Sequence, residues 1–212
     1  MSLRIHEIFF SLQGEASRVG LPTVFVRLTG CPLRCGYCDT AYAFQGGESL
    51  ELDEILKRVA SHGARHITVT GGEPLAQKDC LPLLNRLCDA GYDVSLETGG
   101  SLDIAGVDPR VSVILDIKTP GSDEAGKNLW KNLDLLKPKD EVKFVLCSRE
   151  DYDWARRVLA DRAIVAKCPV LFSPVYGQLK GRELAEWILA DHLPVRFQLQ
   201  LHKLLWGEEP GR

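Results

Sequence analysis

Three cysteines lie close together in the segment from Gly30 to Thr40. Cys31, Cys35 and Cys38 form a Cys-x3-Cys-x2-Cys array within one short loop. Thiolates are soft ligands that select zinc, copper(I) or iron–sulfur clusters over hard cations. A structural zinc site usually takes four closed positions from two separated ligand pairs, and no second pair follows here at such a spacing. The array therefore predicts a metal cluster with one position left open.

The array, with Tyr37 just before its last cysteine, resembles the signature of the radical S-adenosylmethionine (SAM) superfamily. The resemblance implies that Cys31, Cys35 and Cys38 hold a [4Fe–4S] cluster whose fourth iron is chelated by SAM. An electron from the cluster then cleaves SAM to a 5′-deoxyadenosyl radical, which abstracts a substrate hydrogen. It also implies that Tyr37, Cys38 and Asp39 lie against SAM.

A zinc site is the alternative interpretation of the same cysteines. His62 or His66 could supply a fourth ligand, which would make the chain a non-enzymatic zinc-binding module. The other four cysteines are scattered through apolar segments, where we expect small buried hydrophobic residues. They are Cys80, Cys88, Cys147 and Cys168.

Length and composition indicate one soluble domain spanning residues 1–212. Of the 212 residues, 45% are apolar and 26% charged, and the net charge of −3 gives no reason to expect a nucleic-acid partner. No apolar run approaches the length of a membrane span, and Met1 to Glu7 lacks a signal-peptide core. An odd number of cysteines, three of them clustered, fits a reducing cytoplasm.

Strand-like runs alternate with segments of helical periodicity along the chain. We expect strands at 4–9, 23–28, 67–70, 94–97, 111–116, 141–146, 170–173 and 195–201. We expect helices from an N-cap at Ser49 to His62, and at 81–91, 129–136, 151–159 and 182–190, but no full helix at 99–109. This α/β alternation implies parallel βαβ units in an open doubly wound sheet or a partial barrel. The superfamily resemblance implies the second, a partial (β/α)6 barrel.

Polar motifs follow the predicted strands, where both folds place functional residues. Gly71-Gly72-Glu73-Pro74 resembles the superfamily element that contacts the SAM amino group, although alone it could be a turn with a solvated glutamate. Glu97 ends the next strand and could hold ribose hydroxyls or a substrate amine. The remaining cofactor-binding candidates are Asp116, Ile117, Lys118 and Ser173. Lys143 is as well explained by a surface or ion-pair role as by a site role.

Three further features bear on the substrate. The turn around Leu12, Gln13, Gly14 and Glu15 carries an amide and a carboxylate that can read the edge of a planar heterocycle. Arg27 could pair with a substrate carboxylate, or else form an ion pair with a barrel acid such as Glu15. The Thr40 hydroxyl could be a ligand of Mg²⁺, or could bond its own loop backbone.

These residues together resemble one family, the 7-carboxy-7-deazaguanine synthases of queuosine and 7-deazapurine biosynthesis. The resemblance covers nearly the whole chain and includes Thr70 and the closing Gln200-Leu201-His202-Lys203. It implies ring contraction of 6-carboxy-5,6,7,8-tetrahydropterin with loss of ammonia, a pterin site at Leu12 to Glu15, Arg27, Thr70 and His202, and Mg²⁺ on Thr40. It also implies a homodimer and an electron donor such as flavodoxin. A glycyl-radical activating enzyme shares the cysteine spacing and remains the enzymatic alternative.

Overall fold

One curved sheet organises the chain. In the computed structural model, which describes residues 1–207, 209 and 211, nine strands follow the order β3-β1-β2-β4-β5-β6-β7-β8-β9. β1 (Ser2–Leu12) runs antiparallel to both β2 (Pro22–Leu28) and β3 (Glu48–Glu51). From β2 onward all neighbours are parallel. These strands are β4 (His66–Gly71), β5 (Asp93–Thr98), β6 (Ser112–Ile117), β7 (Glu141–Leu146), β8 (Val170–Pro174) and β9 (Arg196–Phe197).

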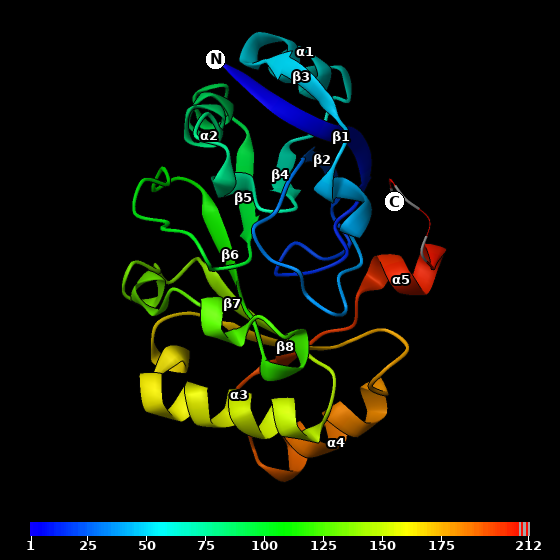
Figure 1. Cartoon of the computed structure of the whole chain (residues 1–212), viewed down its shortest axis with the longest axis vertical. Helices are drawn as coiled ribbons and strands as arrows, with labels where there is room; N and C mark the ends of the chain where they lie inside the picture. The colour runs from blue at the N-terminus through cyan, green and yellow to red at the C-terminus, as the bar shows by residue number, and fades with distance from the viewer. Residues whose placement is uncertain (208, 210, 212) are drawn as a thin grey trace.

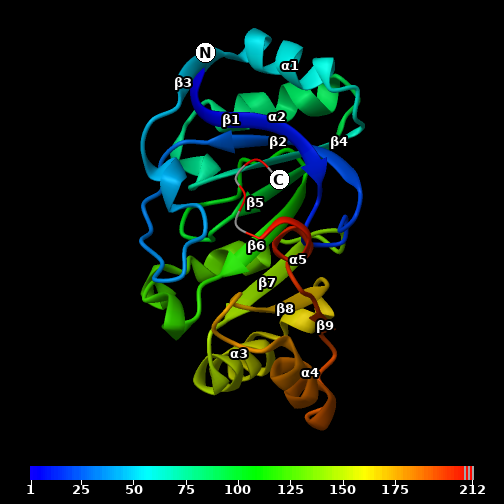
Figure 2. The ribbon, with the colours of Figure 1, turned by 90° about the vertical axis from the view of Figure 1, so that its right-hand side faces the viewer.

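Four helices cover the outside of the sheet, and a fifth lies on the other side. The outer helices are α1 (Leu52–Ser61), α2 (Cys80–Asp89), α3 (Arg149–Arg162) and α4 (Gly181–Ala190). The short α5 (Leu201–Trp206) lies on the open, inner side (Figure 1) and stands in front of the strands when that side faces the viewer (Figure 2). No helix in the described part of the chain has the length and apolar character to cross a membrane.

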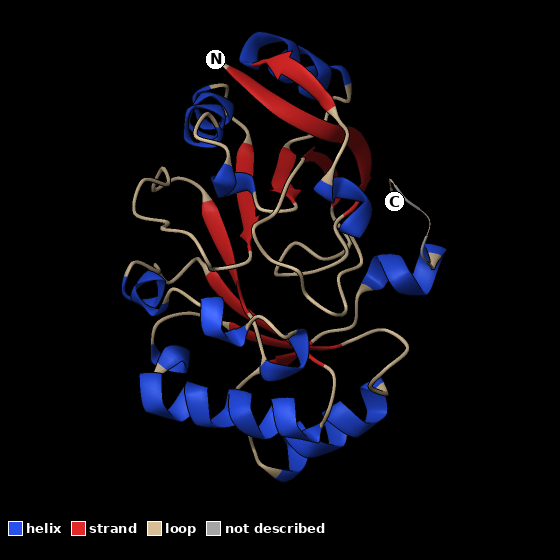
Figure 3. Cartoon of the chain, in the orientation of Figure 1, coloured by secondary structure: helices blue, strands red, loops and turns tan. Residues whose placement is uncertain are grey.

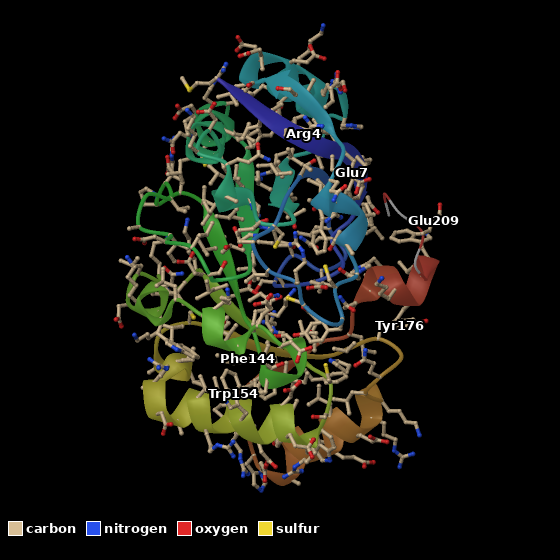
Figure 4. The ribbon with its side chains drawn as sticks, viewed as in Figure 1. Arg4, Glu7, Phe144, Trp154, Tyr176 and Glu209 are labelled. Atoms are coloured by element: carbon tan, nitrogen blue, oxygen red, sulfur yellow. The ribbon has the colours of Figure 1, made fainter. Side chains whose placement is uncertain are left out.

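The core consists of two apolar layers between the sheet and its outer helices. One joins β1, β2, β4 and β5 to α1 and α2, and the other joins β6, β7 and β8 to α3 and α4. In the second layer Phe144 packs edge-on against Phe172 and Trp154, with ring centroids 5.4 and 6.4 Å apart (Figure 4). The parallel strands are apolar on the face that meets the outer helices, whereas their inner face also carries buried polar side chains such as Thr68, Ser95 and Lys143.

The predicted α/β class and partial barrel are confirmed, since the helices lie outside a curved sheet rather than on both faces of a flat one. The segment 99–109 lacks an α-helix, as predicted, and runs as a loop between β5 and β6 (Figure 3). The segment 129–136 forms only a 3₁₀ helix, Trp130–Asp134. Two local predictions were wrong. Ser49 is not an N-cap but part of edge strand β3, and 195–201 is strand only at Arg196–Phe197 before α5 begins.

The β1–β2 connection, residues 13–21, folds into the barrel and bonds to several strands. The Ala16 N–H donates to Gln198 Oε1 (2.6 Å), and Gln198 Nε2 donates to the Ala16 carbonyl (3.0 Å). The Ser17 N–H donates to Glu141 at the start of β7, and Arg18 pairs with Asp93 at the start of β5. The loop therefore ties β5, β7 and the segment after β9 together.

Replacing Gln198 tests this closure. Gln198→Ala leaves a buried N–H and a buried carbonyl without partners, so we expect the free energy of unfolding to fall by about 2–3 kcal/mol in urea denaturation. The matched variant Gln45→Ala alters an exposed glutamine and should cost less than about 0.5 kcal/mol. Equal stabilities of the two variants would contradict the proposed closure.

Candidate active site

A cavity of about 400 Å³ opens at the carboxyl ends of the parallel strands. Its lining comes from the loops after β2, β4, β5, β6 and β8, from the turn after β1 and from α5. Of the predicted site residues, all but Gly14, Glu73, Ile117 and Ser173 line this cavity. The sequence motifs that were separated along the chain therefore meet in one place.

Cys31, Cys35 and Cys38 line the same cavity as free thiols. Burial raises the pKa of both the Cys31 and Cys35 thiols, so metal binding must displace their protons. Among the described residues, no three histidine, cysteine, aspartate or glutamate side chains gather closely enough to hold one metal ion. A four-iron cluster makes a different demand, because each thiolate binds a different iron. This donor set suits a cluster rather than a single ion.

The two histidines considered as zinc ligands lie elsewhere. His62 stacks on Phe10 with ring centroids 6.1 Å apart, and His66 Nδ1 lies 3.0 Å from Asp93 Oδ2. Neither lines the cavity. Neither histidine can therefore complete a zinc site with the three cysteines.

The glycine motif after β4 packs its backbone against the cysteine loop. A Cβ on Gly72 would lie 2.2 Å from the Gly30 carbonyl oxygen and 2.9 Å from the Cys31 Cβ. The Glu73 N–H donates to the same Gly30 carbonyl at 2.7 Å. Only glycine lets residue 72 lie this close to the cysteine loop, because any side chain would collide with Gly30. Beside Cys31 the cavity is therefore lined by the backbone of Gly72 and not by a side chain. Such a surface fits a bulky ligand held against the cluster.

The Glu73 side chain links the end of β4 to the end of β5. Its buried carboxylate accepts hydrogen bonds from the Thr98 hydroxyl (2.9 Å), the Gly99 N–H (2.8 Å) and the Leu75 N–H (3.1 Å). Burial raises the pKa of Glu73, and these donors oppose the rise. Its predicted contact with SAM stays a prediction, and the observed bonds couple β4 to β5.

The end of β6 contributes a half-buried ion pair near the cysteines. Lys118 Nζ lies 3.1 Å from Asp116 Oδ2. Burial alone would lower the pKa of Lys118, but Asp116, Cys35 and Tyr37 raise it well above its usual value. Asp116 Oδ1 is buried without a partner among the described residues, and the Tyr37 hydroxyl donates to the Val145 carbonyl (3.2 Å). The ammonium and the free oxygen are polar groups available to a zwitterionic ligand.

Lys143 is the central cation of the cavity. Its Nζ lies 2.5 Å from Glu15 Oε2 and 3.5 Å from Asp116 Oδ2, and its side chain is 11% exposed. Burial disfavours the charged forms of both partners, but the attraction outweighs it, so the pKa of Glu15 is lowered and that of Lys143 is raised. The sequence left the role of Lys143 open because charge and strand position alone do not separate a surface lysine from a buried one.

Gln13, Thr70 and Glu97 form a second polar group on the cavity wall. Gln13 Nε2 donates to Thr68 Oγ1 (3.1 Å) and to Glu97 Oε1 (3.2 Å), while the Thr70 hydroxyl donates to Glu97 Oε2 (2.9 Å). Burial and the nearby Glu15 raise the pKa of Glu97, against the effect of Lys143. The Glu97 carboxyl therefore ionises less readily than that of a free glutamate.

The C-terminal motif docks onto the turn after β1. Gln200 Nε2 donates to Glu15 Oε1 (2.6 Å), and the Leu201 N–H donates to the Gly14 carbonyl (3.0 Å). A Cβ on Gly14 would lie 2.1 Å from His202 Nδ1, so glycine is needed for this contact. Burial lowers the pKa of His202, which faces the cavity beside Lys203. The first and last motifs of the sequence thus form one wall.

Arg27 and Thr40 line the mouth of the cavity. Arg27 forms an ion pair with an acid, as one interpretation expected, but the partner is Glu7 at 2.7 Å and not Glu15. The Thr40 hydroxyl donates to Asp39 Oδ1 at 2.9 Å, and Asp39 Oδ2 lies 3.8 Å from Lys203 Nζ. Sequence reasoning missed Glu7 and the lining residue Tyr42, because nothing in their local sequence marks them as site residues.

Removing Lys143 tests the buried ion pair. Lys143→Met leaves the buried Glu15 carboxylate without its cation, whereas Asp116 keeps Lys118, and we expect the free energy of unfolding to fall by about 3–5 kcal/mol in urea. Adding Glu15→Gln should restore part of that loss. Lys131→Met removes an exposed pair with Asp103 and should cost less than about 1 kcal/mol. A Lys143 variant as stable as the Lys131 variant would contradict the buried pair.

The raised pKa of Glu97 predicts a pH-dependent difference in stability. A carboxyl whose pKa is higher in the folded state loses stability as pH rises above its unfolded value of about 4.3. Glu97→Gln cannot ionise, so the variant should gain stability relative to wild type as the pH rises above that unfolded value in urea titrations. Glu54→Gln removes an exposed carboxyl of lowered pKa and should show no such trend. A constant difference for Glu97→Gln would refute the assignment.

Comparison with known proteins agrees with this geometry. Residues 25–159 match the family model of the Radical SAM superfamily. The chain is similar to the 7-carboxy-7-deazaguanine synthases of Chlorobaculum tepidum (50% identical; 98% of this chain and 96% of the relative covered) and Koribacter versatilis (41%; 98% of each). The crystal structure of QueE from Escherichia coli superposes with a TM-score of 0.79 at 25% identity, covering 95% of both chains.

A TYW1 structure, at 12% identity and a TM-score of 0.60, shares the fold alone. The full-length matches at up to 50% identity show more than the fold. The chain is a radical SAM enzyme that uses a [4Fe–4S] cluster and SAM, and it belongs to the 7-carboxy-7-deazaguanine synthase family.

Proposed function

We propose that this chain converts 6-carboxy-5,6,7,8-tetrahydropterin into 7-carboxy-7-deazaguanine with release of ammonia. The observation that carries this proposal is the composition of the one cavity that the three cysteines share with Gln13, Glu15, Arg27 and Glu97. The product and ammonia together contain every atom of the substrate. The conversion therefore needs no net oxidant or reductant, and SAM can be regenerated.

Two groups of cavity residues suit the cofactors. Cys31, Cys35 and Cys38 would hold the cluster, while Gly72, Tyr37, Asp39 and the Asp116–Lys118 segment would hold SAM. The bound cofactors supply the radical that removes a hydrogen atom from the substrate. Lys118 offers a cation to a carboxylate, and the backbone at Gly72 accepts close packing. Ser173, whose Oγ is buried without a partner among the described residues, and Ile117 would support that site from behind.

The remaining polar wall suits a carboxylated pterin. Gln13 and Glu15 can bond the amino and amide groups of the heterocycle, with Leu12 against its ring and Gly14 giving His202 access. Arg27 would bind the substrate carboxylate at the mouth. Glu97, held by Thr70 and Gln13, would take or return a proton as nitrogen leaves. The segment from His202 would exclude water; residues 208, 210 and 212 of it lie outside the described part.

Thr40 would bind Mg²⁺ together with substrate oxygens and water. Its hydroxyl proton points to Asp39, and this leaves the oxygen lone pairs available to a hard cation. Lys203 balances the Asp39 charge from the C-terminal segment.

We also propose that residues 1–212 act as one domain in a cytoplasmic homodimer, reduced by a donor such as flavodoxin. The exposed Pro32, Arg34 and Gly36 would give such a donor access to the cysteine loop. Arg34 supports that loop, because its Nη1 donates to the Cys31 carbonyl (2.7 Å) and its guanidinium lies 4.4 Å from the Phe44 ring centroid.

Anaerobic turnover tests the reaction. Reconstituted protein with SAM, a chemical reductant, Mg²⁺ and carboxytetrahydropterin should form 7-carboxy-7-deazaguanine and ammonia in equal amounts, measured by mass spectrometry. The control protein carries Cys35→Ala and should form neither. Absence of product from wild type that contains a full cluster and binds SAM would refute the substrate assignment.

Replacing Thr40 tests the metal site. Thr40→Val keeps the side-chain shape but removes the hydroxyl, so we expect the Mg²⁺ concentration for half-maximal turnover to rise about tenfold or more. Thr40→Ser retains the hydroxyl and should behave like wild type. SAM binding, measured by calorimetry, should be unchanged in both variants. An unaltered Mg²⁺ dependence in Thr40→Val would exclude Thr40 as a ligand.

A further inference from the structure

Glu7 and Tyr42 hold the guanidinium of Arg27 at the cavity mouth. Arg27 Nε donates to Glu7 Oε1 at 2.7 Å, and the Tyr42 hydroxyl donates to the same oxygen at 2.9 Å. Burial and the Glu7 carboxylate raise the pKa of Tyr42 to about 12, so its hydroxyl remains a donor. One carboxylate oxygen therefore links the arginine and the tyrosine.

A β-bulge makes this contact possible. In the β1–β2 pair Ile5 faces Leu28, but from Glu7 onward the register shifts by one residue, so that Glu7 faces Arg27 directly. Because side chains alternate between faces, the extra residue at His6 decides which β1 side chain lies beside Arg27. Figure 4 labels Glu7 on this part of β1, on the side of the molecule that carries the C-terminal segment.

Aromatic rings flank the guanidinium of Arg27. The Arg27 Cζ lies 5.6 Å from the Phe9 ring centroid and 5.9 Å from that of Tyr42, and Phe9 stacks on Phe25 at 4.9 Å. The arginine side chain is only 14% exposed. Within residues 1–207, 209 and 211, no hydrogen bond occupies Arg27 Nη1 or Nη2. The two nitrogens that can grip a carboxylate in a bidentate manner are thus left for a ligand.

We propose that Glu7, assisted by Tyr42, is a positioning residue that directs Arg27 toward the substrate carboxylate and so sets the preference for a carboxylated pterin. This inference rests on the proposed function. When Nε is already held by Glu7, the arginine side chain is ordered before the ligand binds. Nη1 and Nη2 can then bind a carboxylate without a further loss of side-chain entropy. Neither Glu7 nor Tyr42 needs to touch the substrate for this effect.

Two ligands and three variants test the proposal. The ligands are 6-carboxypterin, which lacks the reactive reduced ring, and pterin, which lacks the carboxylate. Both are titrated by calorimetry into SAM-loaded holoenzyme. Glu7→Ala should weaken 6-carboxypterin binding about tenfold and leave pterin and SAM binding within about twofold. Glu7→Gln keeps an acceptor oxygen and should recover most of the preference, and Tyr42→Phe should lose about threefold.

Turnover gives a second readout. For carboxytetrahydropterin, Glu7→Ala should raise KM about tenfold with kcat nearly unchanged. The lost contact stabilises the bound substrate and the transition state equally. The control Glu48→Ala removes a carboxylate from exposed edge strand β3, where it pairs with Arg58, and should match wild type.

Three outcomes would overturn the proposal. One is unchanged 6-carboxypterin binding by Glu7→Ala. Another is tighter binding, which would mean that Glu7 only competes for the arginine. The third is an equal loss of 6-carboxypterin, pterin and SAM, which would indicate a structural role. Wild-type enzyme with no preference for 6-carboxypterin over pterin would instead contradict the proposed substrate itself, and the inference would fall with it.

Discussion

The buried ion pair between Glu15 and Lys143 is the constraint on which the site depends. Lys143 projects from β7 into the barrel, and Glu15 reaches it from the turn after β1. Removing either charge would leave the other in a poorly solvated interior, at a cost of several kcal/mol. The pair therefore holds the 13–21 loop inside the barrel, and Gln200 of the C-terminal motif bonds to the other oxygen of Glu15.

Charge balance connects the two halves of the cavity. The carboxylates Glu15, Glu97 and Asp116 converge on Lys143, and Asp116 also pairs with Lys118 beside the cysteines. Lys118 and Lys143 both pair with Asp116. These ion pairs connect the half of the cavity that suits SAM to the half that suits the pterin. The raised pKa of Glu97 follows from this crowding, since burial and Glu15 both disfavour its charge.

Much of the fold and of the site was predictable because its determinants are local. Cysteine spacing and the alternation of apolar runs with helical periodicity depend only on near neighbours in the chain. The errors arose where an element depends on a distant partner. Ser49 lies in a strand because residues 48–51 pair with Ser2–Ile5 of β1. Residues 201–206 form a helix that follows Gln200, whose side chain bonds to Glu15.

The sequence by itself determined the cysteine array, the Gly71-Gly72-Glu73-Pro74 motif and the family, since these depend only on residue type and spacing. Only the tertiary structure decided what the charged residues do. Arg27 pairs with Glu7 rather than Glu15, and Lys143 lies inside the barrel rather than on the surface. The physical reason is that an ion pair depends on distance and burial in space, and a one-residue bulge at His6 or a folded-in loop changes both without altering any local motif.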